Sequence, residues 1–136
     1  MNKREKVFSL PVRVYFQDTD AGGVVYHASY VNFMERARTE WLRTFGYSNA
    51  GLMKELGVVF VVRSMKLDYL KPALLDDLVQ VTARIVEIGR SRLNLHQTVL
   101  RGDEVLTEAE VHLVCVKLET FKPTAVPDVL RDQWKD

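Results

Sequence analysis

The sequence predicts an α+β fold in which one antiparallel sheet curls around a single long helix. One stretch has the apolar period of a long amphipathic helix, whereas most of the remainder alternates between apolar and polar residues, as half-buried strands do. The later strand segments have no helix between them, so hairpins must join them and the sheet must be antiparallel. A chain of 136 residues is long enough for one domain with a real core, and we expect a single domain over residues 1–136.

The first half of the chain supplies one strand and the helices. Alternation predicts a strand from Val7 to Phe16, and a loop rich in Asp and Gly follows it. The long helix is predicted from about Ser29 to Phe45. Its apolar residues recur at spacings of three and four: Tyr30, Phe33, Met34, Ala37, Trp41, Leu42 and Phe45. Gly46 stands where a left-handed C-terminal cap belongs, and a short helix is expected from Ser48 through Leu56.

The second half of the chain is predicted to be β structure. Strands are expected at 58–69, 79–88, 92–101 and 104–119, and one turn of helix at Asp128–Gln133. The alternation changes phase after Ile85, which predicts a bulge in that strand. The run Val58–Val62 carries none of the charges that usually protect an edge strand. We therefore expect two copies of the chain to pair edge to edge through this run.

Composition and charge exclude several classes of function. The formal net charge of +1 gives no strong field for binding nucleic acid or an anionic membrane. The single cysteine, Cys115, excludes an internal disulfide and fits a reducing compartment. The segment Met1–Pro11 is charged and lacks the apolar core of a signal peptide, and no apolar run approaches the ~20 residues of a membrane span. A soluble cytoplasmic protein is expected.

The candidate site is the stretch Phe16–Tyr30, between the first strand and the long helix. Asp18 and Asp20 are two residues apart, so they would share a face of an extended segment. Gly22-Gly23 allows positive φ and close approach of a ligand. His27 lies near the predicted helix start, where backbone N–H groups lack partners and the dipole is positive. These groups could serve acyl transfer, or they could form only an Asp-rich turn with a helix cap.

A longer pattern in the same region resembles a known family. The run YFQDTDAGGVVYHASY from Tyr15 to Tyr30, followed by FMERAR from Phe33 to Arg38, is similar to the 4-hydroxybenzoyl-CoA thioesterase family of hotdog-fold enzymes. Within that family it most resembles the YbgC-type acyl-CoA thioesterases encoded with the bacterial Tol-Pal system. The similarity extends from about Val12 to Val126. It implies a hotdog fold, with a curled five-stranded sheet around one central helix. It also implies a homodimer joined edge to edge, or a homotetramer built from two such dimers.

The resemblance also implies roles for single residues. It places the family's catalytic carboxylate on Asp20 and gives Asp18 a part in shaping the loop. His27 occupies the position whose backbone N–H points at the thioester oxygen. A histidine there is typical of the YbgC-type branch, whereas the hydroxybenzoyl branch has a tyrosine, so an aliphatic acyl-CoA is the expected substrate. Asp20 would either activate water or attack the carbonyl carbon, and the sequence leaves that choice and the role of the His27 imidazole open.

Five further residues are candidates for substrate binding. Tyr26 and Tyr30 could line the acyl pocket, although residues beside a helix start are equally expected in the core. Ser64 could reach the site from a partner subunit, or it could simply face solvent. The resemblance suggests Arg90 and Arg92 for the phosphates of CoA, whereas charges on a turn are usually only solvated. No cofactor is expected, and no set of His, Cys and carboxylate residues has the spacing of a metal site.

Two other functions stay open at this point. A hotdog dehydratase or hydratase acting on acyl carrier protein would pair His27 with an acid on the helix, for which Glu35 is the obvious candidate. A protein that only binds acyl carrier protein would use a basic helix face made of Arg36, Arg38 and Arg43. The position of Asp20 fits hydrolysis better than the chemistry of a dehydratase or hydratase.

Overall fold

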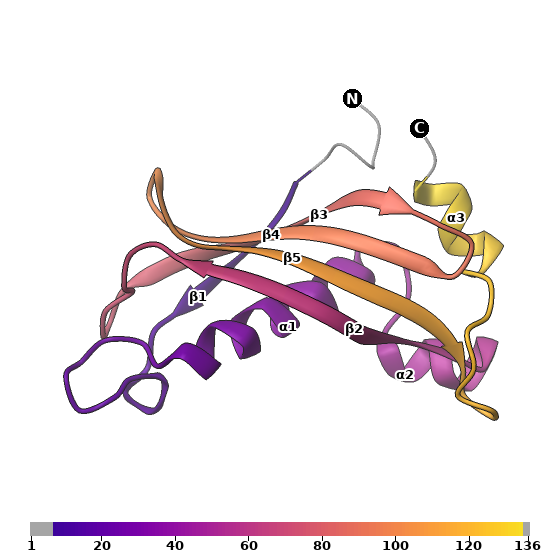
Figure 1. The fold of residues 1–136 in the computed structure, drawn as a ribbon, viewed down its shortest axis with the longest axis horizontal. Helices are drawn as coiled ribbons and strands as arrows, with labels where there is room; N and C mark the ends of the chain where they lie inside the picture. Colours follow the sequence, from indigo (N-terminus) through magenta and orange to yellow (C-terminus); the bar gives the residue numbers. More distant parts are fainter. Residues whose placement is uncertain (1–6, 135–136) are drawn as a thin grey trace.

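The fold is a sheet bent over one long helix, with two shorter helical segments near the C-terminal end of that helix (Figure 1). The structure is a computed structural model that describes residues 7–134. In chain order the elements are β1 (Phe8–Arg13), a 3-10 turn (Phe16–Asp18), α1 (His27–Arg43), α2 (Asn49–Gly51), a π turn (Leu52–Leu56), β2 (Val58–Tyr69), β3 (Leu78–Ile88), β4 (Arg92–Arg101), β5 (Glu104–Lys117) and α3 (Asp128–Trp134). The predicted α+β class is confirmed.

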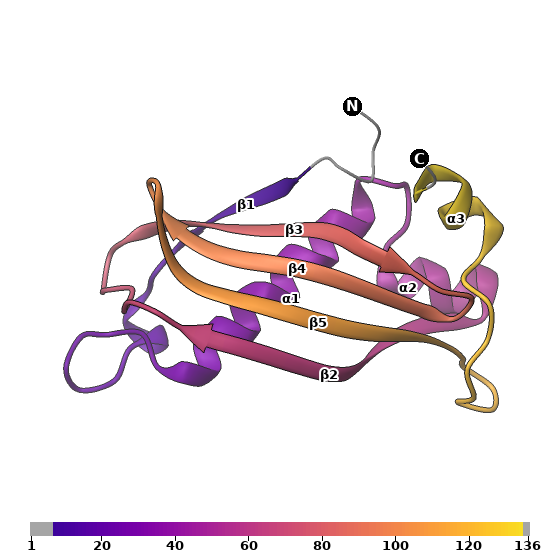
Figure 2. The same ribbon diagram turned by 45° about the horizontal axis from the view of Figure 1, so that its top comes forward.

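The sheet has five strands in the order β1-β3-β4-β5-β2, and every neighbouring pair is antiparallel. Figure 2 shows the strands in this order, with α1 crossing behind them. Tight turns join β3 to β4 and β4 to β5, as the hairpin argument requires. The strand β2 lies at one edge of the sheet, so Val58–Val62 is an edge segment as the sequence predicted.

Register shifts bend the strands around the helix. One lies between Ile85 and Glu87, where the sequence predicts a bulge, so that prediction is confirmed. Two more shifts, between Val62 and Ser64 in β2 and between Val99 and Leu100 in β4, have no clear signal in the sequence. A bulge adds twist and bend at one point of a strand, which helps long strands follow the curved surface of α1.

Several element boundaries differ from the prediction; for example, β5 ends at Lys117 and not at residue 119, and α1 ends at Arg43 and not at Phe45. β1 ends at Arg13, because the following residues turn to form a 3-10 turn closed by the Asp18 carboxylate, which accepts the Tyr15 N–H. α1 begins two residues early, at His27, with Tyr26 in the cap position. α3 continues to Trp134, because that indole side chain is fully buried and anchors the last turn.

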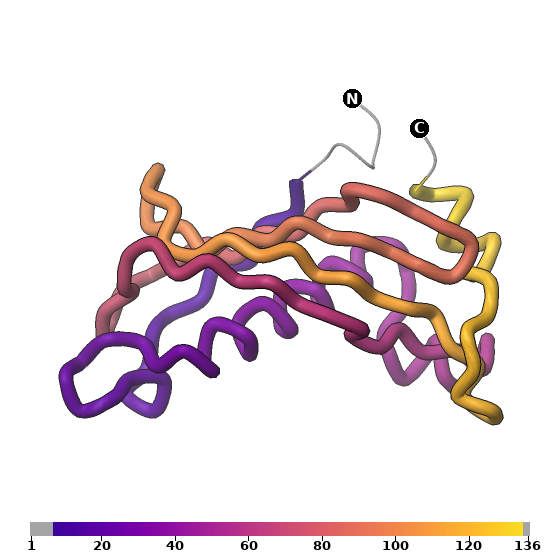
Figure 3. Tube along the Cα trace, viewed as in Figure 1, coloured from indigo at the N-terminus to yellow at the C-terminus, as the bar shows by residue number. Residues whose placement is uncertain are grey.

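The core lies between α1 and the concave face of the sheet. Phe33, Met34 and Ala37 of α1 are completely buried there, each large side chain contributing about 1.5–3 kcal/mol through burial. At the far end the Trp134 ring stacks on Trp41 with ring centroids 5.3 Å apart. Figure 3 shows the C-terminal segment, in yellow, passing the β3–β4 turn before it reaches α3. Among the described residues, no helix is both long and apolar enough to cross a membrane.

Candidate active site

The loop between the 3-10 turn and α1 is closed on itself by backbone hydrogen bonds. The Tyr26 N–H donates to the Asp18 carbonyl at 2.9 Å, and the Asp20 N–H donates to the Val24 carbonyl at 3.0 Å. Gly23 turns the chain at a φ of 78°, in the left-handed region that favours glycine. The glycine pair therefore lets the chain reverse between Asp20 and the helix, and brings that carboxylate back beside the helix start.

Asp18 shapes this loop from within. Its side chain is buried, and its Oδ2 accepts the Tyr15 N–H at 2.8 Å. Its backbone carbonyl also accepts the Ser29 hydroxyl at 3.1 Å. Asp18 thus joins the 3-10 turn to the first turn of α1, which is the loop-shaping position that the resemblance implied.

Asp20 differs from Asp18 in exposure and in its partners. It is exposed, and its Oδ1 accepts the Gly22 N–H at 2.8 Å. Within residues 7–134, its other carboxylate oxygen accepts no hydrogen bond. One oxygen is held by the loop while the other is available to a water molecule or a substrate, which suits a general base or a nucleophile.

The first turn of α1 presents free hydrogen-bond donors beside this carboxylate. Tyr26 caps the helix without a side-chain hydrogen bond. The Ser29 N–H is satisfied by the Tyr26 carbonyl at 2.9 Å. The N–H groups of His27 and Ala28 find no acceptor in the described part of the chain. Two aligned donors and the positive end of a helix dipole form an arrangement that stabilises an oxyanion.

A pocket of about 260 Å³ connects the carboxylate and the helix start. Its walls are formed by the loop, α1, the end of β2 and the segment after it: Asp20, Val24, Val25, Tyr26, His27, Tyr30, Tyr69, Leu70, Lys71 and Pro72. Four residues that the sequence proposed separately, Asp20, Tyr26, His27 and Tyr30, therefore lie in one pocket.

Tyr69 is a pocket residue that the sequence reasoning missed. Its ring stands edge-on to the His27 ring with centroids 4.8 Å apart, and its hydroxyl donates to the His27 carbonyl at 3.4 Å. Its register partner is the buried residue Thr107, so Tyr69 lies on the inner face at the end of β2. The alternation of β2 carried that signal, but only the fold places this strand end beside α1.

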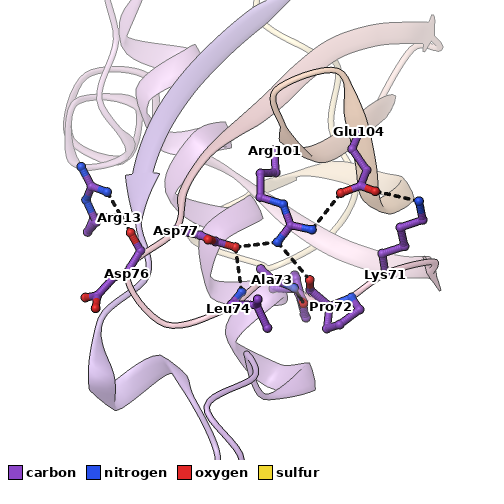
Figure 4. Close-up of polar contacts among 10 residues, drawn as sticks. Arg13, Lys71, Pro72, Ala73, Leu74, Asp76, Asp77, Arg101 and Glu104 are labelled. Carbon is purple, nitrogen blue, oxygen red and sulfur yellow. Dashed lines mark hydrogen bonds and ion pairs between the residues drawn. The ribbon is translucent and has the colours of Figure 1, made fainter.

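The segment 70–77 contributes Leu70, Lys71 and Pro72 to the pocket wall and is attached to the loop that carries Asp20. The Val25 N–H donates to the Ala73 carbonyl at 2.9 Å, and the Leu75 N–H donates to the Gly23 carbonyl at 3.0 Å. A polar network behind this segment holds it to the β4–β5 hairpin (Figure 4). Arg101 is the centre of that network, with contacts of 2.7 Å to Asp77 and 2.8 Å to Glu104.

The hydrogen bonds in this network shift the pKa values of its charged groups. Hydrogen bonds to Asp77 and Glu104 raise the pKa of Arg101. Hydrogen bonds from Lys71, at 2.6 Å, and from Arg101 lower the pKa of Glu104. The Asp77 carboxylate also accepts the Leu74 N–H at 2.9 Å, so the network fixes the backbone of the pocket wall as well as its side chains.

Three predicted substrate residues lie elsewhere in the chain. Ser64 and Arg92 line a hollow of about 500 Å³ that also includes Arg63, Asn94 and His112. Arg90 is exposed on the β3–β4 turn, at the opposite end of β3 from the segment 70–77. Within the described chain none of these three residues lines the Asp20 pocket, because Arg90 and Arg92 lie at the other end of the sheet and Ser64 lies in the middle of β2.

The remaining candidates have structural positions. Glu35 and Arg38 line a different pocket, so Glu35 is not a wall residue of the His27 pocket. Arg38 donates to the side chain of Gln97 at 2.9 Å, and burial lowers the pKa of Arg38. Arg38 therefore points toward the sheet and does not form a docking face with Arg36 and Arg43.

Cys115 is buried, and burial raises the pKa of its thiol to about 11. An un-ionised buried thiol is a poor nucleophile, which agrees with the expected core role. No group of three or more His, Cys, Asp and Glu side chains in the described part of the chain could hold a metal ion.

Comparison with known proteins finds thioesterases. The model of the thioesterase-like superfamily matches residues 14–134. An acyl-CoA thioesterase YbgC of Haemophilus influenzae is 46% identical over 120 residues, covering 88% of each chain. An acyl-CoA thioester hydrolase YbgC of Escherichia coli O6:H1 is 47% identical over 130 residues, covering 95% of this chain and 96% of its own.

A solved structure has the same fold. The crystal structure of a probable thioesterase from Bartonella henselae superposes with a TM-score of 0.86 at 36% identity, covering 90% of this chain and 100% of that one. The expected hotdog fold is thereby confirmed. On these matches the chain belongs to the thioesterase-like superfamily of hotdog proteins, in its YbgC branch, and is a thioester hydrolase.

Proposed function

We propose that the chain hydrolyses acyl-CoA thioesters, with Asp20 as general base or nucleophile and the N–H groups of His27 and Ala28 as the oxyanion hole. The observation that carries the proposal is a pocket that contains both Asp20, with a carboxylate oxygen that accepts no hydrogen bond from residues 7–134, and the start of α1, where two N–H groups have no acceptor among those residues. The YbgC relatives act on acyl-CoA by name, which supports the same substrate class here. Such a substrate also supports a cytoplasmic location.

The chemistry needs few groups, because a thiolate is a good leaving group. Its conjugate thiol has a pKa of about 8.5, taking cysteine as the reference. In the water route, Asp20 removes a proton from water as the oxygen adds to the carbonyl carbon, and the negative charge moves to the carbonyl oxygen. Collapse of that intermediate breaks the C–S bond and releases CoA. In the covalent route, Asp20 forms a mixed anhydride, which water then hydrolyses.

The proposed donors stabilise the charge on the carbonyl oxygen. Loss of one such donor typically costs about 10²–10³ in turnover. The donors here are backbone groups, so side-chain substitution at His27 leaves them in place. A His27→Ala variant therefore tests only the role of the imidazole.

The central test is Asp20→Asn, assayed by release of free thiol from a panel of acyl-CoA substrates. We expect turnover to fall to background while the fold, followed by circular dichroism, is unchanged, because Asp20 is exposed and supports only a local turn. Asp103→Asn, the same change on an exposed residue of the β4–β5 turn, is the control and should retain full activity. Near-normal activity of Asp20→Asn would refute the assignment.

Two additions refine the proposal. Oxygen-18 from water that appears in Asp20 itself during a single turnover would show covalent attack, whereas label only in the product acid would favour the water route. The same panel should show faster release from aliphatic than from aromatic acyl groups. Faster release from acyl carrier protein than from CoA would instead favour a carrier-protein substrate.

We also propose that two chains complete the substrate site. Antiparallel pairing of two β2 edges brings the Tyr69 end of one strand near the Val58 end of the other. In each chain, Val58 and Arg92 lie at the same end of the sheet, because both pair near the end of β5. A second copy would therefore bring Ser64, Arg90 and Arg92 toward this pocket, where the arginines could bind the phosphates of CoA.

A further inference from the structure

Tyr30 has a hydrogen-bond donor that no residue of the described chain accepts. Its side chain is 3% exposed and forms part of the pocket wall with Asp20 and His27. Its hydroxyl oxygen accepts the Ala73 N–H at 2.9 Å. The hydroxyl proton has no acceptor among residues 7–134. The oxygen is satisfied as an acceptor, and the proton is available to a group bound in the pocket.

The surroundings of Tyr30 fix the position of its hydroxyl. Its ring packs edge-on against Tyr69, with centroids 5.5 Å apart, and against Phe33 at 6.2 Å. The Ala73 N–H holds the oxygen from the side of the pocket wall. An oxygen that already accepts a hydrogen bond becomes a better donor, because neighbouring hydrogen bonds polarise one another.

The place of Tyr30 on α1 directs it toward the oxyanion donors. Tyr30 follows His27 by three residues, so the two lie on the same face of the helix. A long side chain on a helix leans toward the N-terminus, which brings the ring of Tyr30 over the first turn. Burial raises the pKa of Tyr30, so the hydroxyl keeps its proton at neutral pH.

We propose that the Tyr30 hydroxyl donates a hydrogen bond to the thioester carbonyl oxygen, as a third donor beside the N–H groups of His27 and Ala28. This inference rests on the proposed function and adds a catalytic residue to it. Asp20 is a less suitable acceptor, since a hydrogen bond from Tyr30 would reduce its basicity, and the structure has no such bond. The carbonyl oxygen gains negative charge during attack, so a donor aimed at it acts mainly in the transition state.

The test replaces Tyr30 by tyrosine analogues whose ring fluorines make the phenol more acidic. The ionised analogue still accepts the Ala73 N–H but can no longer donate. We therefore expect kcat to fall on the alkaline side of the pH profile, at a pH that decreases as the analogue becomes more acidic. At a pH where the phenol has ionised, kcat should fall about 10²–10³-fold, the effect of one oxyanion donor. Tyr30→Phe should show a loss of similar size at every pH.

The same analogues at Tyr47, which packs against the core outside the pocket, are the control and should leave the profile unchanged. If the profiles of the Tyr30 analogues match that of the unmodified enzyme while Asp20→Asn is inactive, Tyr30 is not a donor and the hydrolase assignment stands. If the unmodified enzyme hydrolyses no acyl-CoA, the proposed function itself is wrong.

Discussion

At the scale of single residues, the two aspartates of the loop have separate tasks. Asp18 is buried and accepts a backbone N–H, whereas Asp20 is exposed and has a carboxylate oxygen that accepts no hydrogen bond within the described chain. Removal of a buried acceptor leaves its donor unsatisfied, which costs about 1–3 kcal/mol. We therefore expect Asp18→Ala to lower the free energy of unfolding by that amount, as measured by urea denaturation. Asp20→Ala should change it by less than about 0.5 kcal/mol.

A matched variant separates the geometry of Asp18 from its charge. Asp18→Asn keeps an oxygen that can accept the Tyr15 N–H, so it should lose much less stability than Asp18→Ala. Equal stability of all three variants would contradict the role assigned to Asp18.

The sequence could not separate the two acids on spacing alone, because their alternation suggested a shared face. Burial, which depends on the 3-10 turn and on Ser29, distinguishes them.

At the scale of elements, the segment 70–77 holds the loop that carries Asp20 in place. It pairs with that loop through Ala73 and Leu75, and the Arg101 network holds it from behind (Figure 4). Partly exposed ion pairs contribute little to overall stability. A displacement of about 1 Å in an active site can nevertheless cost about 10²-fold in rate. The network should therefore matter more for activity than for stability.

We expect Arg101→Met to lower kcat/KM by about 10-fold or more with only a small change in melting temperature, because it keeps the apolar stem and removes both ion pairs. Hydrogen exchange should show faster exchange of the Leu74 amide, which Asp77 then holds less firmly. Arg84→Met, the same change in the middle of β3, is the control. Equal activity of the two variants would show that the network does not position the site.

The sequence predicted the helices and strands well, but it did not predict the contacts between residues that are far apart in the chain. Periodicity located α1, because seven buried side chains of that helix repeat at helical spacing. Hairpin order predicted the antiparallel sheet, and the resemblance selected Asp20 and His27. Tyr69, Ala73 and Arg101 were not found, since each acts through a contact distant in sequence: 42 residues from His27, 43 from Tyr30 and 24 from Asp77. No local pattern encodes those pairings.

At the scale of the whole molecule, the exposed edge of β2 is the surface that we expect a second copy of the chain to cover. β2 has 12 residues and, within residues 7–134, pairs only with β5, so its other side presents unpaired backbone groups, which include those of the uncharged run Val58–Val62. Among the pockets beside this strand, the one with Asp20 contains Tyr69, and another of about 150 Å³ contains Phe60 and Val62. Antiparallel pairing of two copies would bring the first pocket of one chain toward the second pocket of the other.

Dimerisation through β2 can be tested with a charge placed at the edge. Val62 is 48% exposed there, and Val62→Lys should disfavour pairing, so light scattering at micromolar concentration should give a monomer. Because we place part of the substrate site on the second copy, this monomer should also lose most acyl-CoA hydrolysis although Asp20 and His27 are unchanged. Val129→Lys, a similarly exposed change on α3, should remain a fully active dimer. An unmodified protein that is monomeric yet active would show that one chain holds the whole site.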